Sequence, residues 1–148
     1  AAQNATTGQN NVTIGYNSSS PSNTSSHNVT LGNSSTAALR CQVTSITALS
    51  DRRDKTDIVD LPTGLDFINK LRPVKFKWAM REKSSNNGKV RAGFIAQDFD
   101  KAQVGAEYLD LVMKDNPEKL EARQGHLIPV LVKAIQQLSQ KVAALEAA

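Results

Sequence analysis

The sequence predicts an α+β protein in which a β-rich stub precedes a small α+β domain that ends in a long helix. Three observations support this division. A short motif repeats near the start of the chain, two runs of alternating apolar residues flank a turn in the middle, and an apolar heptad pattern fills the end. Charge divides the chain at the same place, because residues 1–50 contain a single charged side chain, Arg40, and all 14 acidic residues follow. We therefore expect two domains, residues 1–50 and 51–148.

Residues 1–36 are rich in small polar side chains, with Ser, Thr or Asn at 21 of 36 positions. That composition alone is typical of a disordered linker. The segment nevertheless repeats itself, because Asn11-Val-Thr-Ile-Gly15 returns 17 residues later as Asn28-Val-Thr-Leu-Gly32. A short strand closed by glycine and asparagine is typical of one rung of a β-solenoid or a triple-stranded β-prism. Two rungs cannot bury a core alone, so we expect upstream fibre domains of a longer chain, or other copies of it, to complete the shaft.

Residues 37–50 are expected to continue as extended structure, with Leu39, Cys41 and Val43 on one face, and Ser45 is the next position of the same alternation. An uncharged segment of this kind would promote aggregation if it lay on a free sheet edge. Burial within a shaft built from several chains would remove that edge.

The middle of the chain predicts a β-hairpin. Alternating apolar residues run from Val74 to Met80 and again from Val90 to Ala96, and the turn-forming residues Ser84 to Gly88 lie between them. The large aromatic side chains of Trp78 and Phe94 fall on the apolar positions, and we expect both in the core.

Shorter signals predict the remaining elements of this domain. Leu65, Ile68 and Leu71 lie at helical spacing ahead of Pro73, which predicts a helix that ends before the proline. A second helix is expected over residues 97–106, and a third short strand over residues 108–113. Together these elements predict a small α+β domain.

The clearest local pattern is an apolar heptad seam at Ile128, Leu131, Ile135, Leu138, Val142 and Leu145. The unbroken alternation of three- and four-residue steps predicts a coiled-coil helix over about 126–147, in which Pro129 is compatible with the first turn. The seam could pack on its own domain, but exposed positions rich in Gln, Lys and Ala favour packing against copies of the helix. β-Branched residues at a with Leu at d favour two parallel strands. A β-prism shaft requires threefold closure, so we expect a homotrimer.

The two expected domains meet at Ser50-Asp51-Arg52-Arg53-Asp54-Lys55. This segment places a hydroxyl and an amine five residues apart, and a neutral lysine amine can take the proton from a serine that is otherwise a poor nucleophile. The chemistry requires the lysine pKa to fall, through desolvation or through neighbouring cations such as Arg52 and Arg53. The same spacing is common in ordinary surface turns, so by itself it is a weak signal.

Composition argues against several other classes of function. The formal net charge is +4 and the isoelectric point about 9.3, but the basic residues are scattered among acidic ones, so we expect no nucleic-acid partner. Cys41 is the only cysteine, and His27 and His126 lie far apart. We therefore expect no disulfide, no metal site and no cofactor. No apolar run approaches the ~18 residues that a membrane span needs, so we expect no membrane partner.

Four motifs follow one another along the chain: Ser50-Asp-Arg-Arg-Asp-Lys55, Leu71-Arg-Pro-Val-Lys-Phe-Lys-Trp78, Gly93-Phe-Ile-Ala-Gln-Asp98 and the segment from Leu127 to Leu138. In this order they resemble the C-terminal intramolecular chaperone, or auto-processing, domain of phage tailspikes, endosialidases and tail fibres. Similar domains occur in a membrane-bound animal transcription factor. The resemblance covers roughly residues 46–148.

The resemblance implies that Ser50 is a catalytic serine, that Lys55 is its partner and that Ser50–Asp51 is the bond cut. It also implies three chains per assembly, folding in the host cytoplasm and a final place in a virion tail fibre or tailspike. Asp54 departs from the family pattern, in which an apolar residue is usual at this position. A carboxylate beside Lys55 favours its charged form and should slow a general base.

The expected function is therefore that of an intramolecular chaperone with a single self-cleavage. It would trimerise, align shaft strands whose non-local pairing is slow, and cut itself free. The alternatives are a structural trimerisation domain that does not cleave, and a receptor-binding fibre tip that uses loops such as Ser84–Gly88.

The cleavage chemistry stays open at this point. The Ser50 hydroxyl can attack the Leu49 carbonyl, which would cut before Ser50, whereas attack on its own carbonyl would require a strained four-membered ring. A cut after Ser50 implies an activated water, a hydroxyl of a neighbouring chain, or help from Asp51.

Overall fold

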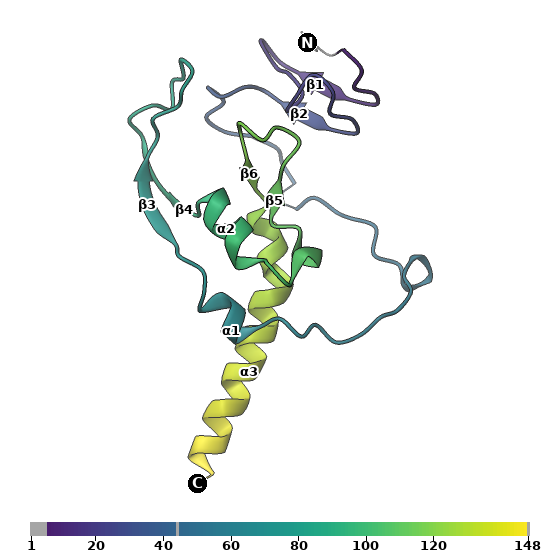
Figure 1. Ribbon diagram of the computed structural model, residues 1–148, viewed down its shortest axis with the longest axis vertical. Helices are drawn as coiled ribbons and strands as arrows, with labels where there is room; N and C mark the ends of the chain where they lie inside the picture. Colours follow the sequence, from purple (N-terminus) through teal and green to yellow (C-terminus); the bar gives the residue numbers. More distant parts are fainter. Residues whose placement is uncertain (1–5, 44, 148) are drawn as a thin grey trace.

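The computed structural model describes residues 6–43 and 45–147 of the chain. Its strands are β1 (Val12–Ile14), β2 (Val29–Leu31), β3 (Val74–Lys77), β4 (Val90–Gly93), β5 (Val112–Met113) and β6 (Glu121–Ala122). Its α-helices are α1 (Leu65–Ile68), α2 (Ala96–Ala102) and α3 (Ile128–Glu146), and three 3-10 helices are η1 (Arg52–Asp54), η2 (Glu107–Leu109) and η3 (Gln124–Leu127). Figure 1 shows the β1–β2 stub at one end and the long helix α3 leading to the C-terminus at the other. The small α+β arrangement with a long final helix is as predicted.

The repeated motif forms two stacked strands. β1 and β2 pair in parallel with Val12 opposite Val29, so each residue faces its counterpart 17 positions later. Gly15 and Gly32 end the two strands with positive φ angles of 121° and 83°. A Cβ on Gly15 would lie 3.3 Å from the Cα of Gly32, so the glycines also permit the close stacking. The apolar strand residues Val12, Ile14, Val29 and Leu31 remain exposed.

The predicted hairpin is present. β3 and β4 are antiparallel with Val74 opposite Gly93 and Lys77 opposite Val90, and a hydrogen bond of 3.0 Å from the Trp78 amide to the Lys89 carbonyl continues the ladder. The prediction for Trp78 was wrong, because its side chain is 40% exposed and packs edge-on against Phe76. Phe94 does pack against the core, with its ring 4.7 Å from that of Phe99.

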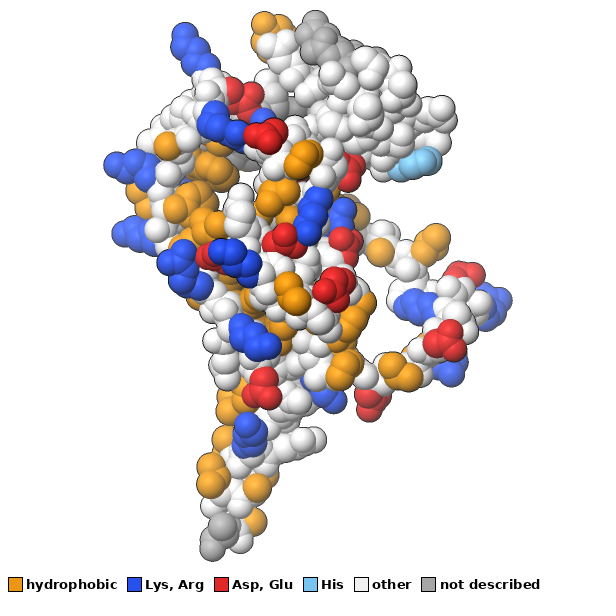
Figure 2. Space-filling model, in the orientation of Figure 1, with side chains coloured by type: hydrophobic (Ala, Val, Ile, Leu, Met, Phe, Trp, Pro, Cys, Tyr) orange, Lys and Arg blue, Asp and Glu red, His pale blue; other side chains and the backbone are white. Residues whose placement is uncertain are grey.

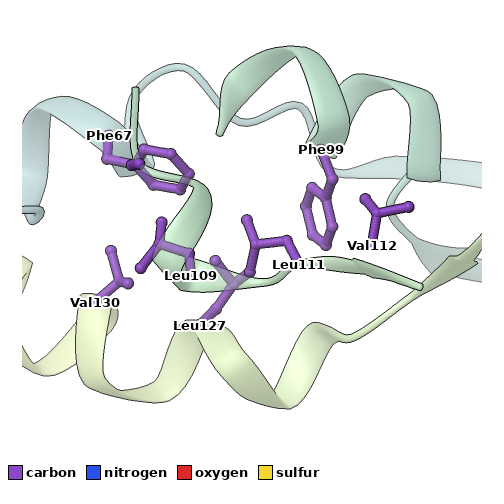
Figure 3. Packing of buried hydrophobic residues seen from close by; sticks show 8 residues of the cluster. Phe67, Phe99, Leu109, Leu111, Val112, Leu127 and Val130 are labelled. Carbon is purple, nitrogen blue, oxygen red and sulfur yellow. The ribbon is translucent and has the colours of Figure 1, made fainter. Parts of the chain in front are cut away.

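Helices α1, α2 and α3, the 3-10 helices η2 and η3 and strand β5 contribute to one small core. The core residues are Phe67, Phe99, Ala106, Leu109, Leu111, Val112, Leu127 and Val130, and Figure 3 shows most of them converging between α2 and the start of α3. Leu111 and Val130 are completely buried. Burying a side chain of this size contributes about 1.5–3 kcal/mol. This core fixes the first turns of α3 against the domain.

Several predicted boundaries are wrong for identifiable reasons. α1 ends at Ile68 instead of reaching Leu71, because the amides of Lys70 and Leu71 bond three residues back and the chain tightens ahead of Pro73. The strand expected over 108–113 is interrupted by Asp110, whose φ of 48° is left-handed, so η2 precedes a strand of two residues.

Two other differences concern short elements. α2 ends four residues earlier than expected, and Gly105 with a φ of 82° leads the chain away. β6 was not predicted, because two residues show no periodicity. Residues 37–43 and 45–50 form no strand, and residue 44 lies outside the described residues. No helix within residues 6–43 and 45–147 is long and apolar enough to cross a membrane.

Candidate processing segment and assembly surfaces

The segment that carries Ser50 is an exposed arm, defined here as residues 37–60. Every described residue of the arm is exposed, and Leu49, directly before Ser50, is 97% exposed. The chain is held at both ends of the arm, through residues 34–36 on one side and through the partly buried Leu61 on the other. Figure 1 shows the arm swinging away from the body, and Figure 2 shows acidic and basic side chains gathered at its tip.

Within the arm, the 3-10 turn η1 brings Ser50 and Lys55 together. The Lys55 amide donates to the Arg52 carbonyl at 3.2 Å, which folds the chain back. The Lys55 Nζ then lies 2.6 Å from Ser50 Oγ and 3.4 Å from the Ser50 carbonyl oxygen. One ammonium group therefore contacts both the predicted nucleophile and the carbonyl of the Ser50–Asp51 bond. Such a contact suits either proton transfer or stabilisation of charge on that oxygen.

Asp51 is occupied by a different partner. Its Oδ1 accepts from the Arg53 amide at 2.8 Å, and its Oδ2 accepts from the Arg53 guanidinium at 2.7 Å. The side-chain hydrogen bond with Arg53 lowers the pKa of Asp51, and the same bond raises the pKa of Arg53. Asp51 is thus ionised, accepts hydrogen bonds from Arg53 on both of its carboxylate oxygens, and caps η1. It is therefore poorly placed to act as the acid or base of a cleavage step.

The remaining charged residues of the motif do not contact the Ser50–Lys55 pair. Among the described residues, the ion pair of this segment joins Arg53 to Asp51, Asp54 forms none with Lys55, and the Arg52 side chain forms none at all. Any influence of Asp54 on Lys55 therefore acts through space. No group of His, Cys, Asp or Glu in the described ranges could hold a metal ion.

The heptad seam of α3 faces away from its own domain. Its six residues are between 43% and 78% exposed, whereas Leu127, Val130 and Ala134 on the adjacent side of the same helix face the core. The helix thus has two apolar sides, one covered and one open. The alternative in which the seam packs on its own domain is excluded. Figure 2 shows apolar side chains along the free lower part of this helix.

A second surface joins the domain to the stub. We call loop residues 84–86 the clamp. The Ser84 hydroxyl donates to the Ser34 carbonyl at 2.7 Å, the Ser85 hydroxyl to the Ser35 carbonyl at 3.1 Å, and the Asn86 amide group to the carbonyls of Ser34 and Thr36 at 2.9 and 3.2 Å. These four bonds end on three backbone oxygens, and a fifth runs from the Ser85 amide to the Ser35 hydroxyl at 3.2 Å. The clamp therefore recognises the path of the chain more than its side chains.

A neighbouring loop reinforces the clamp. Asn116 donates to the Pro21 carbonyl at 2.9 Å, and Lys119 pairs with Glu82, beside the clamp, at 2.6 Å. The hydrogen bond and charge of Lys119 lower the pKa of Glu82. The ion pair thus ties together the two loops that touch the stub.

These features define an α+β domain whose loops are hydrogen-bonded to a two-stranded β stub and whose last helix carries an open apolar seam. Residues 50–109 match the family model Peptidase_S74, described as the chaperone of endosialidase. Residues 50–109 are therefore similar to that family, as the motifs predicted, and the match begins at Ser50 itself. No curated protein and no solved structure matched the chain.

The sequence alone did not indicate the clamp. Ser84 and Asn86 were predicted only as turn residues, and their partners lie 50 or more positions earlier in the chain. A contact between residues so far apart in the sequence leaves no local spacing pattern from which it could be predicted.

Proposed function

We propose that this chain is the C-terminal end of a phage tail fibre or tailspike that assembles as a homotrimer and then cuts itself between Ser50 and Asp51. Residues 1–50 would stay with the shaft, and residues 51–148 would act as the chaperone and leave. The observation that carries the proposal is the 2.6 Å contact between Ser50 Oγ and Lys55 Nζ in an exposed arm, at the first residue of the family match. The match of residues 50–109 to the family model supports the chaperone role.

Trimer formation is supported by the apolar groups that one chain leaves uncovered. The seam of α3 stays open, and so do the strand residues Val12, Ile14, Val29 and Leu31 at the opposite end. Apolar surface at both ends of one molecule favours assembly with copies of itself. A threefold β-prism or triple β-helix would cover the strands, and a three-stranded coiled coil would cover the seam.

The clamp supplies a means of registering the shaft. Donors from residues 84–86 and Asn116 bond backbone carbonyls of the last rung and of the turn before it. Three chaperone domains joined by the coil would present three clamps at fixed spacing, and each would hold one shaft end. This use of the loop favours a chaperone over a receptor-binding tip built from Ser84–Gly88.

The cleavage breaks the C–N bond between Ser50 and Asp51 and forms a C–O bond at the Ser50 carbonyl carbon. The Asp51 nitrogen takes a proton and leaves as an amine. Because Asp51 is engaged by Arg53, the oxygen nucleophile would be a water, or the Ser50 hydroxyl of a neighbouring chain whose proton is taken by the Lys55 beside it. In the second case an ester forms first, and water then hydrolyses it. The reaction needs no cofactor and each chain is cut once.

Intact-mass spectrometry of the purified, folded chain tests the proposal. Cleavage after Ser50 would divide the 148 residues into fragments of 50 and 98, and Ser50→Ala should remain whole while still forming trimers. A wild-type trimer that stays uncut would show a structural trimerisation domain instead. Cleavage of Ser50→Ala at the wild-type rate would rule out the Ser–Lys pair.

A further inference from the structure

Helix α1, which follows the arm in the chain, is hydrogen-bonded to α3 through the side chain of Gln137. Its Oε1 accepts a hydrogen bond of 2.7 Å from the amide of Leu65, the first residue of α1. The amides at the start of a helix have no partner within the helix, and α1 has no capping side chain from its own residues. Gln137 therefore caps α1 from a residue 72 positions later in the chain.

Gly64 makes this close approach possible. It is buried, and a Cβ at this position would lie 2.4 Å from Gln137 Oε1 and 2.9 Å from Lys133 Cγ. Both distances are too short for real atoms, so any larger residue would displace the Gln137 side chain or push α1 and α3 apart. We call this close contact, between Gly64 and Leu65 at the start of α1 and Gln137 of α3, the junction.

The position of Gln137 on α3 gives the junction its significance. It lies in the same helical turn as the seam residues Ile135 and Leu138, but on the side that faces its own domain. Packing of the seam against other chains would fix this turn in the assembly. The junction would then fix residue 64 relative to the bundle. From there the chain runs through Thr63, which bonds to Tyr108, and Leu61 into the exposed arm.

We propose that Gln137 is a positioning residue for self-cleavage, which anchors the arm that carries Ser50 and Lys55 to the coiled-coil helix. The inference rests on the proposed function, because it concerns the rate of that cleavage. It adds a route by which assembly of the seam governs where the arm lies. Gln137 does not touch the reacting atoms, and it acts through Leu65 and the chain that precedes it.

Two substitutions separate the acceptor role of Gln137 from simple packing. Gln137→Met keeps the length of the side chain and removes the acceptor, whereas Gln137→Glu keeps the acceptor and adds a negative charge that the start of a helix favours. We expect Gln137→Met to cleave about tenfold more slowly or worse, since small misplacements of reacting groups have effects of this order. Gln137→Glu should cleave at close to the wild-type rate. A packing role would not give this order of rates.

The measurement is the first-order rate of appearance of the 50-residue fragment, with hydrogen exchange at the Leu65 amide as a second readout. The amide should be protected in the wild type and in Gln137→Glu, and should exchange faster in Gln137→Met. Gln136→Met is the matched control, because Gln136 is exposed on the same helix and makes no side-chain hydrogen bond within the described residues. It should cleave as the wild type does, and all variants should sediment as trimers.

Gly64→Ala provides an independent variant. It should slow cleavage through the same displacement of α1, and its effect should shrink in a Gln137→Ala background, where the nearest clash is gone.

The outcomes distinguish this inference from the proposed function. If wild type is cut and Gln137→Met is cut equally fast, the junction has no positioning role and the proposed function stands. Equal slowing by Met and Glu would assign the effect to packing and would also overturn it. Loss of the trimer in Gln137→Met would place the residue in assembly and not in positioning. A wild-type trimer that is never cut overturns both.

Discussion

Lys55 is the residue whose chemical role matters most, because its ammonium contacts two atoms of Ser50. The shorter contact, 2.6 Å to Oγ, suits a base that takes the hydroxyl proton, and the longer one, 3.4 Å to the carbonyl oxygen, suits a positive charge that stabilises an oxyanion. A base must be neutral at the moment of transfer, whereas an oxyanion partner must be charged. The two roles therefore predict different variants.

We expect Lys55→Arg to be as inactive as Lys55→Ala. Arginine retains the charge and the reach but does not lose its proton in a protein, so it cannot serve as a base. The check is the rate of cleavage by intact mass, with trimer content measured in parallel. Substantial cleavage by Lys55→Arg would instead assign Lys55 to the Ser50 carbonyl.

At this scale the sequence predicted the local contact and missed the distant ones. Ser50 and Lys55 lie five residues apart, close enough for one tight turn to join them, and the pattern Asp51-x-Arg53 supplies the cap of that turn. Gln137 sits among polar residues on a helix, and nothing in its neighbours marks it as the partner of Leu65. The residue of the sequence that permits this contact is Gly64, but a glycine alone does not indicate which side chain approaches it.

At the level of elements, the clamp is the part most open to a direct test. Asn86→Asp replaces the donor of two hydrogen bonds with an acceptor and keeps the oxygen that bonds Lys89. Losing two bonds of about 0.5–1.5 kcal/mol each should loosen residues 34–36 from the loop. Limited proteolysis should therefore cut the chain near these residues faster.

Asn87→Asp is the control for that experiment. It adds the same charge one residue away and preserves the oxygen that accepts from the Met80 amide, without touching the stub. Faster proteolysis in both variants would attribute the change to charge and not to the clamp.

The ion pair between Glu82 and Lys119 gives the two clamp loops a pH dependence. Lys119 lowers the pKa of Glu82 below its ordinary value of 4.5, so the carboxylate stabilises the folded arrangement above that value. This contribution is lost as the pH falls through the lowered pKa. Hydrogen exchange in the two loops should therefore rise, relative to its normal pH trend, at acid pH below about 4.5.

Glu82→Gln should remove that acid dependence, and both loops should be looser already at neutral pH. Glu118→Gln serves as the control, because Glu118 forms no ion pair within the described part of the chain. The effect should be small, since the Glu82 side chain is half exposed and water screens the pair. An unchanged acid response in Glu82→Gln would place the effect elsewhere.

Elements with a clear period were predicted well, and elements without one were not. The hairpin alternation, the repeat and the heptad each extend over enough residues to define a pattern. β5 and β6 have two residues each, and their pairing depends on a left-handed Asp110 before β5 and a turn over residues 114–120, which no periodicity indicates. α1 is short because Pro73 affects the chain earlier than its own position suggests.

For the whole molecule, the open seam is the surface that decides between one chain and three. Leu131→Asp and Leu138→Asp should each abolish the trimer, because a charge buried unpaired in a coil interface is costly. Cleavage should be lost with it. Sedimentation equilibrium and intact mass on the same sample provide the check.

Gln136→Asp is the control, since Gln136 lies on the exposed side of the helix away from the seam. It should remain trimeric and be cut normally. Normal cleavage in a monomeric Leu131→Asp would show that assembly does not govern the reaction. A stable wild-type monomer would exclude both the coil and the threefold shaft.

The arm lies between the clamp and the junction at Gln137, and this position has a consequence for release. While the arm is whole, residues 34–36 are tethered to the clamp, so a few exposed hydrogen bonds suffice to hold them at high effective concentration. A cut after Ser50 removes the tether and leaves those bonds to act alone. Each contact then dissociates at its own rate, and water competes for every acceptor. The same few hydrogen bonds would therefore hold the stub firmly during assembly and release it afterwards. The difference would come from the intact arm, which joins residues 34–36 covalently to the domain that carries the clamp.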